Sequence, residues 1–89
     1  MFRVEWLPTA LEELAAIWAT ADESARTATT QAAHQVDTLL SNGPLNEGES
    51  RAGDYRIMYV PPLAIYYRVD LASRVVIVNQ VWPMKRRQR

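Results

Sequence analysis

Side chains that could bind a phosphate group or a nucleobase gather in the second half of the sequence. Arg56, Tyr66 and Arg68 lie within GDYRIMYVPPLAIYYRVD (residues 53–70), which has the pattern of a β-hairpin. Arginine makes planar, two-pronged hydrogen bonds to phosphate, and a tyrosine on an open sheet face can stack on a base. The other members of the set are all basic: Arg51, Lys85, Arg86, Arg87 and Arg89. The set predicts a surface that binds RNA, DNA or an acidic protein.

These residues supply only part of the chemistry of metal-free RNA cleavage. That reaction needs a base for the 2′-hydroxyl, a cation for the phosphorane charge and an acid for the leaving oxygen. Arginine, with a pKa above about 12, supplies only the cation, so Tyr66 or Lys85 would have to act as acid or base. Alternatively, Arg56 and Arg68 are exposed strand residues in cross-strand pairs, such as Asp54 with Arg68. We expect no metal or cofactor, because the sequence has no cysteine and one histidine.

Charge is divided between the two halves of this 89-residue chain, whose net charge is zero. Residues 1–50 hold two basic and eight acidic residues, whereas residues 51–89 hold eight basic and two acidic ones. This division predicts a polar molecule with one basic surface. The length predicts a single domain, residues 1–89. We find neither a signal-peptide pattern nor an apolar run near the roughly 20 residues of a membrane span, and expect a soluble, cytoplasmic protein.

Hydrophobic spacing predicts two helices between a first strand and three later strands. Pro8 suits the first turn of a helix, and Trp18 has the spacing of a core residue on it. The second helix is expected to stop at Asn42-Gly43-Pro44, before a polar loop over residues 45–52. The expected elements are a strand at 2–6, helices at about 8–21 and 24–41, and strands at 55–60, 63–70 and 74–82. The order β-α-α-β-β-β predicts an α+β domain, with a helical hairpin on one face of a small antiparallel sheet.

Two registers are possible for the hairpin around Pro61-Pro62. A two-residue loop would pair Val60 with Leu63, whereas a three-residue loop or a bulge would pair Tyr59 with Leu63. We prefer the second register, because Pro-Pro cannot supply the positive φ of a type I′ turn. It also separates an apolar face from a polar face. This register puts three candidate residues together on the face away from the helices: Arg56, Tyr66 and Arg68.

In this order, the patterns resemble the RelE/ParE superfamily of bacterial toxins from type II toxin–antitoxin pairs. The segment VEWLPTALEELAAIW (residues 4–18) is similar to the family's first strand and helix. The segment GDYRIMYVPPLAIYYRVDLASRVVIVNQVW (residues 53–82) is similar to its sheet. The resemblance covers nearly the whole chain and implies a small cytoplasmic toxin that a cognate antitoxin wraps and neutralises. RelE-like members cleave messenger RNA in the ribosome, and ParE-like members inhibit DNA gyrase.

The resemblance carries over unevenly at individual positions. Arg56 matches a basic catalytic-site residue of RelE-like members, and Arg86 matches the arginine that closes the last family motif. Met58 and Ala64, however, stand where RelE-like members place further cations, and Pro83 stands at a usual histidine position. The candidate catalytic residues are Arg56, Tyr66, Arg68, Lys85 and Arg86. The candidate nucleic-acid-binding residues are Arg51, Arg87 and Arg89.

Three functions follow from the resemblance. The leading hypothesis is growth inhibition by a metal-independent, ribosome-dependent endoribonuclease. The alternative is a ParE-like gyrase inhibitor without catalysis of its own, and the third is a degenerate homologue that only binds an antitoxin. The expected partners are a cognate antitoxin that covers the basic face, and RNA on the ribosome or DNA gyrase. No membrane partner is expected.

Overall fold

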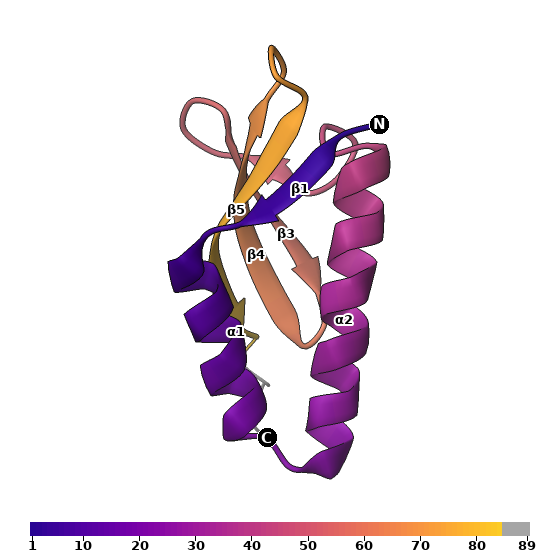
Figure 1. Ribbon diagram of the computed structural model, residues 1–89, viewed down its shortest axis with the longest axis vertical. Coiled ribbons are helices and arrows are strands. Elements are labelled where there is room, and N and C mark those ends of the chain that lie inside the picture. The colour runs from indigo at the N-terminus through magenta and orange to yellow at the C-terminus, as the bar shows by residue number, and fades with distance from the viewer. Residues whose placement is uncertain (85–89) are drawn as a thin grey trace.

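Two helices pack on one face of a five-stranded sheet in the computed structural model, which describes residues 1–84 (Figure 1). Four of the candidate residues, Lys85, Arg86, Arg87 and Arg89, therefore lie outside the described part of the chain. The elements in chain order are β1 (Arg3–Trp6), α1 (Pro8–Ala19), α2 (Glu23–Asn42), β2 (Glu49–Ser50), β3 (Tyr55–Val60), β4 (Leu63–Asp70) and β5 (Val75–Pro83).

The strand order β1-β5-β4-β3-β2 places the first and last strands side by side. The predicted α+β class and the helical hairpin on one face are confirmed, but the sheet is mixed, because β1 runs parallel to β5. Parallel pairing is possible here because a long connection separates these two strands, with no tight turn between them. Strand β2, inside the expected polar loop, pairs Glu49 with Ile57 and was not predicted.

The helix boundaries follow local capping signals. The side chain of Asp22 accepts a hydrogen bond from the Ala25 backbone N–H at 2.8 Å, which satisfies a free donor in the first turn of α2. At the other end of α2, the N–H of Gly43 donates to the Leu39 carbonyl at 3.0 Å. Helix α1 begins at Pro8, as expected, and ends at Ala19, slightly earlier than expected.

The hydrophobic core lies between the helices and the helix-facing side of the sheet. Its fully buried side chains include Val36 and Leu40 of α2, Ile65 and Tyr67 of β4, and Val76 of β5. Burial of each such side chain contributes roughly 1.5–3 kcal/mol to folding. The expectation that Trp18 lies in this core is wrong. Its side chain is 44% exposed on α1, and the guanidinium of Arg26 lies 4.3 Å from its ring centroid.

The β3–β4 hairpin has a two-residue loop, so the preferred register is wrong. Val60 pairs with Leu63 and Arg56 pairs with Tyr67. The Pro61–Pro62 peptide bond is cis, and turns with a cis proline at the third position do not require the positive φ values of type I′. Because side chains alternate between the two faces, the one-residue difference moves every β3 side chain to the face opposite the expected one.

Helix α1 completes the part of β5 that β1 leaves unpaired. β1 ends at Trp6, opposite Val78, and β5 continues beyond this pair. There the N–H of Val81 donates to Oε1 of Glu13 at 2.8 Å. A carboxylate from a helix thus takes the place of a neighbouring strand, which fixes α1 against the sheet.

Replacing Glu13 by alanine should destabilise the fold, because the Val81 N–H would lose its acceptor. A buried donor left unpaired costs about 1–3 kcal/mol, and E13A should reduce the free energy of unfolding in urea by a similar amount. E13Q keeps an oxygen acceptor and should cost less than E13A. The control E12A removes an exposed carboxylate and should change stability by less than about 0.5 kcal/mol. Equal effects of E13A and E12A would contradict a stabilising role for the Val81 contact.

Candidate functional site

The side of the sheet turned away from the helices, here called the open face, is mainly aromatic and aliphatic. Alternation along the strands follows from the observed register. On the three longer strands the open face carries Tyr55, Ile57 and Tyr59 of β3, Ala64, Tyr66, Arg68 and Asp70 of β4, and Val75, Ile77, Gln80 and Trp82 of β5. Within residues 1–84, Arg68 is the only basic residue that these three strands place on this face.

Three rings form a row across β3, β4 and β5, here called the aromatic row. The Tyr66 ring centroid lies 5.0 Å from that of Tyr55, with 14° between the ring planes. It lies 5.9 Å from the Trp82 ring, with 35° between the planes. Such aromatic pairs contribute about 0.5–1.5 kcal/mol beyond the free energy of burying their surface, so the three rings hold one another in place. Sequence reasoning missed Tyr55 and Trp82, although the two-residue-loop register would have placed Tyr55 and Tyr66 on one face.

Arg68 lies on the open face between Tyr55 of β3 and Ile77 of β5. The predicted pairing of Asp54 with Arg68 is wrong, because Tyr55 takes that position. The Arg68 side chain is half-buried and forms no ion pair with any of residues 1–84. Arginine and aromatic residues are the side chains enriched at the energetic centres of protein interfaces. The open face therefore has the composition of a binding surface.

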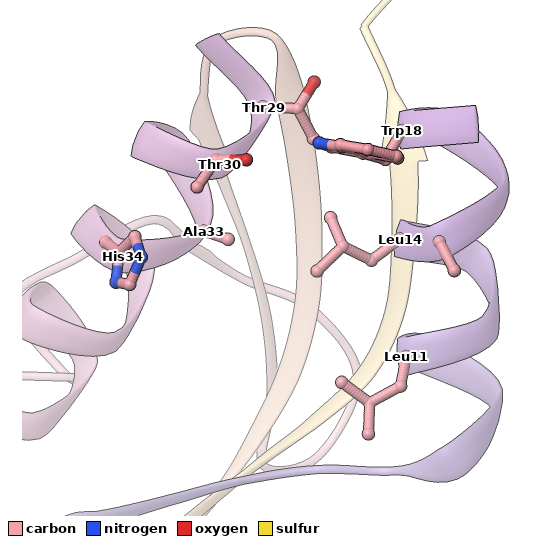
Figure 2. Close-up of a pocket in the computed structure, with 8 residues that line it drawn as sticks. Leu11, Leu14, Trp18, Thr29, Thr30, Ala33 and His34 are labelled. Carbon is pink, nitrogen blue, oxygen red and sulfur yellow. The ribbon is translucent and has the colours of Figure 1, made fainter. Parts of the chain in front are cut away.

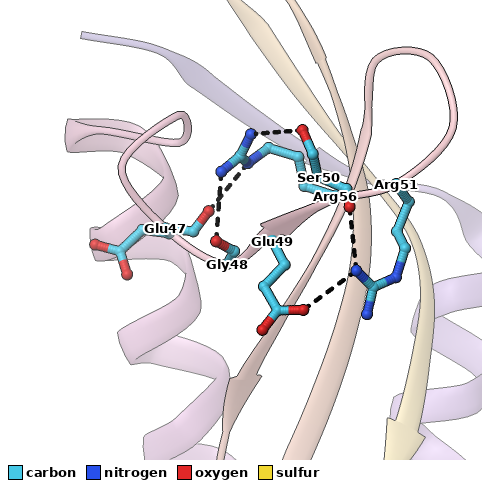
Figure 3. A network of polar contacts seen from close by, with 6 residues as sticks. All are labelled: Glu47, Gly48, Glu49, Ser50, Arg51 and Arg56. Atoms are coloured by element: carbon cyan, nitrogen blue, oxygen red, sulfur yellow. Dashed lines mark hydrogen bonds and ion pairs between the residues drawn. The ribbon is translucent and has the colours of Figure 1, made fainter.

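Arg56 lies on the other face of the sheet, so the predicted grouping of Arg56 with Tyr66 and Arg68 is wrong. Figure 3 shows its guanidinium turned toward the loop between α2 and β2 and toward β2 itself. Nε donates to the Glu47 carbonyl at 3.0 Å, and the terminal nitrogens donate to the Gly48 carbonyl at 3.4 Å and to Ser50 Oγ at 3.3 Å. Gly48 has a φ of 67°, and a Cβ there would lie 2.3 Å from the Ile57 carbonyl oxygen. Arg56 thus holds a tightly packed loop.

Tyr67 supports the same loop from the core. Its hydroxyl oxygen lies 2.8 Å from the carbonyl oxygens of both Pro44 and Glu47. Burial raises the pKa of the Tyr67 hydroxyl above its ordinary value of 10.0, and the nearby Arg56 guanidinium acts in the opposite direction. Arg56 and Tyr67 are cross-strand neighbours, so the register that removes Arg56 from the open face also brings these two groups together.

Arg51, the remaining sequence candidate within residues 1–84, is not brought together with Arg68 and Tyr66. Arg51 is exposed and pairs with Glu49 at 3.2 Å, a surface contact worth about 0–1 kcal/mol (Figure 3). Met58 is buried in the core at 3% exposure, so its side chain does not contribute to the open face. Among residues 1–84 no three His, Asp or Glu side chains are placed to hold a metal ion. None of the helices in that range is long and apolar enough to cross a membrane.

A second surface feature is a groove of about 350 Å³ between the two helices. Figure 2 shows Leu11, Leu14 and Trp18 of α1 pointing toward α2, with Thr30 and His34 on the opposite side. Leu11 is 50% exposed, so the helices do not close over these side chains. The groove is mainly apolar, and we assign no reaction to its lining residues.

The geometry of this chain matches solved toxin structures over nearly its full length. A chain from the structure of the chromosomal ParDE system of P. aeruginosa superposes on this chain with a TM-score of 0.76 at 19% sequence identity. The match covers 96% of this chain and 98% of the ParDE chain. The chain has the RelE/ParE fold. The isolated E. coli RelE toxin gives a TM-score of 0.67 at 18% identity, over 99% of this chain and 89% of RelE.

Toxins solved with their antitoxins have the same fold. The intact E. coli RelBE toxin–antitoxin complex contains a chain that matches with a TM-score of 0.65 at 18% identity, over 97% of this chain and 100% of that one. No family model and no curated protein matches the sequence. The likeness therefore rests on three-dimensional structure, which supports the RelE/ParE resemblance found in the sequence motifs.

The two arginines of the hairpin should differ in their effect on stability. R56A removes three hydrogen bonds from a charged group and should reduce the free energy of unfolding by about 1.5–3 kcal/mol. R68A removes a side chain without an ion pair in residues 1–84, and should change it by less than about 0.5 kcal/mol. Urea unfolding of both variants measures the difference. A larger loss for R68A than for R56A would contradict the assigned structural role of Arg56.

Tyr67 should make the fold sensitive to alkaline pH. Its pKa is raised in the folded state, so above pH 10 the unfolded chain loses the hydroxyl proton first. Stability should be unaffected by this group below that pH and should fall as pH rises through the folded pKa. Urea unfolding between pH 8 and pH 11 should show a shallower decline for Y67F than for the wild type. Y59F, which alters an exposed tyrosine, is the control and should keep the wild-type slope.

Proposed function

We propose that this chain is the toxin of a type II toxin–antitoxin pair and that it inhibits growth by binding a protein target on its open face. The fold supports the toxin role, because the structural relatives are ParE and RelE toxins, several of them solved with antitoxins. The composition of the open face supports the proposal that this face binds a protein target. It presents a row of three aromatic rings, two isoleucines and a single arginine on β3 to β5.

Within residues 1–84, the same face lacks most of what RNA cleavage requires. A nuclease of this kind needs a cation, an acid and a base around one phosphate. On strands β3 to β5, Arg68 supplies one cation, whereas Arg56 points to the opposite face and donates to the Glu47 carbonyl. Ala64 contributes no charge. An aromatic and apolar surface with one arginine is better suited to protein binding, where a few such residues supply most of the binding energy.

The family resemblance supplies a specific target for such a surface. ParE-like members inhibit DNA gyrase, and we propose gyrase as the target of this chain. The same resemblance supplies a cognate antitoxin as its neutralising partner. A cytoplasmic location follows from this proposal, since gyrase acts there.

RNA cleavage in the ribosome is the second candidate function. It is favoured by the tyrosine rings of the aromatic row, which could stack on unpaired bases, and by the neighbouring Arg68. If this candidate is correct, R68A combined with R86A should abolish both toxicity and transcript cleavage. Wild-type cleavage by that double variant would contradict it.

Two assays on the purified chain separate the candidates. Gyrase supercoiling should be inhibited, while messenger RNA on translating ribosomes should remain intact. Y66A and R68A should each weaken gyrase inhibition by about tenfold or more, as expected for loss of about 1.4 kcal/mol or more at an interface centre. Q35A, on the exposed surface of α2, is the matched control and should inhibit like the wild type. Transcript cleavage without gyrase inhibition would overturn the proposal.

A further inference from the structure

A hollow of about 530 Å³ lies where the open face meets the beginning of α1. Three segments distant in sequence form its wall: Leu7, Thr9 and Glu13 from the start of α1, Tyr55 and Tyr66 from the aromatic row, and Asn79 and Gln80 from β5. Within residues 1–84, no lining residue is basic. The hollow therefore combines two aromatic rings with a carboxylate and two side-chain amides.

Glu13 gives this hollow its only formal charge. Its side chain is half-buried, and Oε1 accepts the hydrogen bond from the Val81 N–H. It forms no ion pair with any of residues 1–84. A carboxylate has about four lone-pair sites that can accept hydrogen bonds, and the Val81 N–H occupies one of them. The remaining acceptor sites and the negative charge are available to a ligand.

Asn79 adds a second acceptor with unused capacity. It is the extra residue of a β-bulge, because Tyr66 pairs with Gln80 whereas Tyr67 pairs with Val78. Its Oδ1 is buried and accepts no hydrogen bond from residues 1–84. Buried polar atoms in proteins nearly always have a partner, and a ligand donor can supply one to Oδ1 once the Asn79 side chain turns toward the hollow.

We infer that this hollow binds the guanidinium group of an arginine side chain on a protein partner. The Tyr55 ring stacks only on Tyr66 among the described rings, so its π electrons can attract a cation and a flat guanidinium can stack on it. Its five N–H donors match the acceptors of Glu13, Asn79 and Gln80. This inference rests on the proposed function, since it assumes that the open face holds a protein.

The first turn of α1 opposes the binding of a cation in the hollow. A helix N-terminus carries a partial positive charge of roughly half a unit, which would favour an anion. Glu13 contributes a full negative charge within the same wall, and the rings add to it. Arg68, although on the same face, is not among the lining residues. The balance favours a cationic ligand.

An NMR titration of the ¹⁵N-labelled full chain tests this assignment. The probe is arginine blocked at both ends, N-acetyl-arginine-N-methylamide, which carries one charge on the guanidinium. It should shift the signals of the Val81 N–H and the Gln80 side-chain amide and should saturate in the millimolar range. Blocked citrulline has nearly the same shape without charge and should cause no saturable shift. Blocked lysine has the charge without the plane and should bind several-fold more weakly.

Variants of two adjacent glutamates provide the matched comparison. E13Q removes the charge but keeps an oxygen for the Val81 N–H, and should raise the dissociation constant by about tenfold, the effect of losing one charge-assisted contact. E12Q alters a carboxylate outside the hollow and should bind like the wild type. Urea unfolding of E13Q confirms that the variant is folded.

Four outcomes would overturn the inference. Equal binding of blocked citrulline or lysine would exclude recognition of a guanidinium. Equal affinity of E13Q and wild type would exclude Glu13 as the binding group. Shifts of the same signals by a short uridine oligonucleotide, with none from the arginine probe, would assign the hollow to a nucleic acid. Gyrase inhibition that persists without arginine binding would refute this inference alone and leave the proposed function standing.

Discussion

The pairing of Val60 with Leu63 decides which way each β3 side chain of the central hairpin points. Since strand side chains alternate, this one pair sends Met58 and Val60 into the core beside Ile65 and Tyr67 of β4, and leaves Tyr55 beside Tyr66 on the open face. Burial of an apolar side chain such as Met58 or Val60 is worth roughly 1.5–3 kcal/mol, which favours the observed register. The loop held by Arg56 and the aromatic row are both consequences of that pairing.

The elements could be predicted from the sequence because their signals are local. Pro8 and Asp22 precede the two helices, Gly43 ends the second, and runs of Val, Ile and Tyr mark the strands. The register could not be predicted in the same way, because it depends on the turn geometry and on which face other elements cover. The parallel β1–β5 pair joins segments about 70 residues apart, and no local pattern reports such a contact.

The candidate site shows why residue type alone misleads. Arg56 and Arg68 are both strand arginines of one hairpin, and both were grouped as binding residues. In the folded chain Arg56 donates to loop carbonyls, whereas Arg68 makes no ion pair in residues 1–84. Conversely, Tyr55 and Trp82 gain significance only because the strands bring their rings to either side of Tyr66. The contact of Glu13 with β5 depends on the packing of α1, which no local pattern in the sequence reports.

The position of β5 between β1 and β4 has a consequence for synthesis of the chain. A ribosome produces β1 and α1 before their partners on the sheet, Val75 to Val81, which follow about 70 residues later. Until then β1 has no neighbouring strand and Glu13 has no Val81 N–H from which to accept a hydrogen bond. Contacts between distant segments form late, because they require the closure of a long loop. The open face therefore cannot be assembled before β5 has been synthesised, and binding through it would begin only after this strand has left the ribosome.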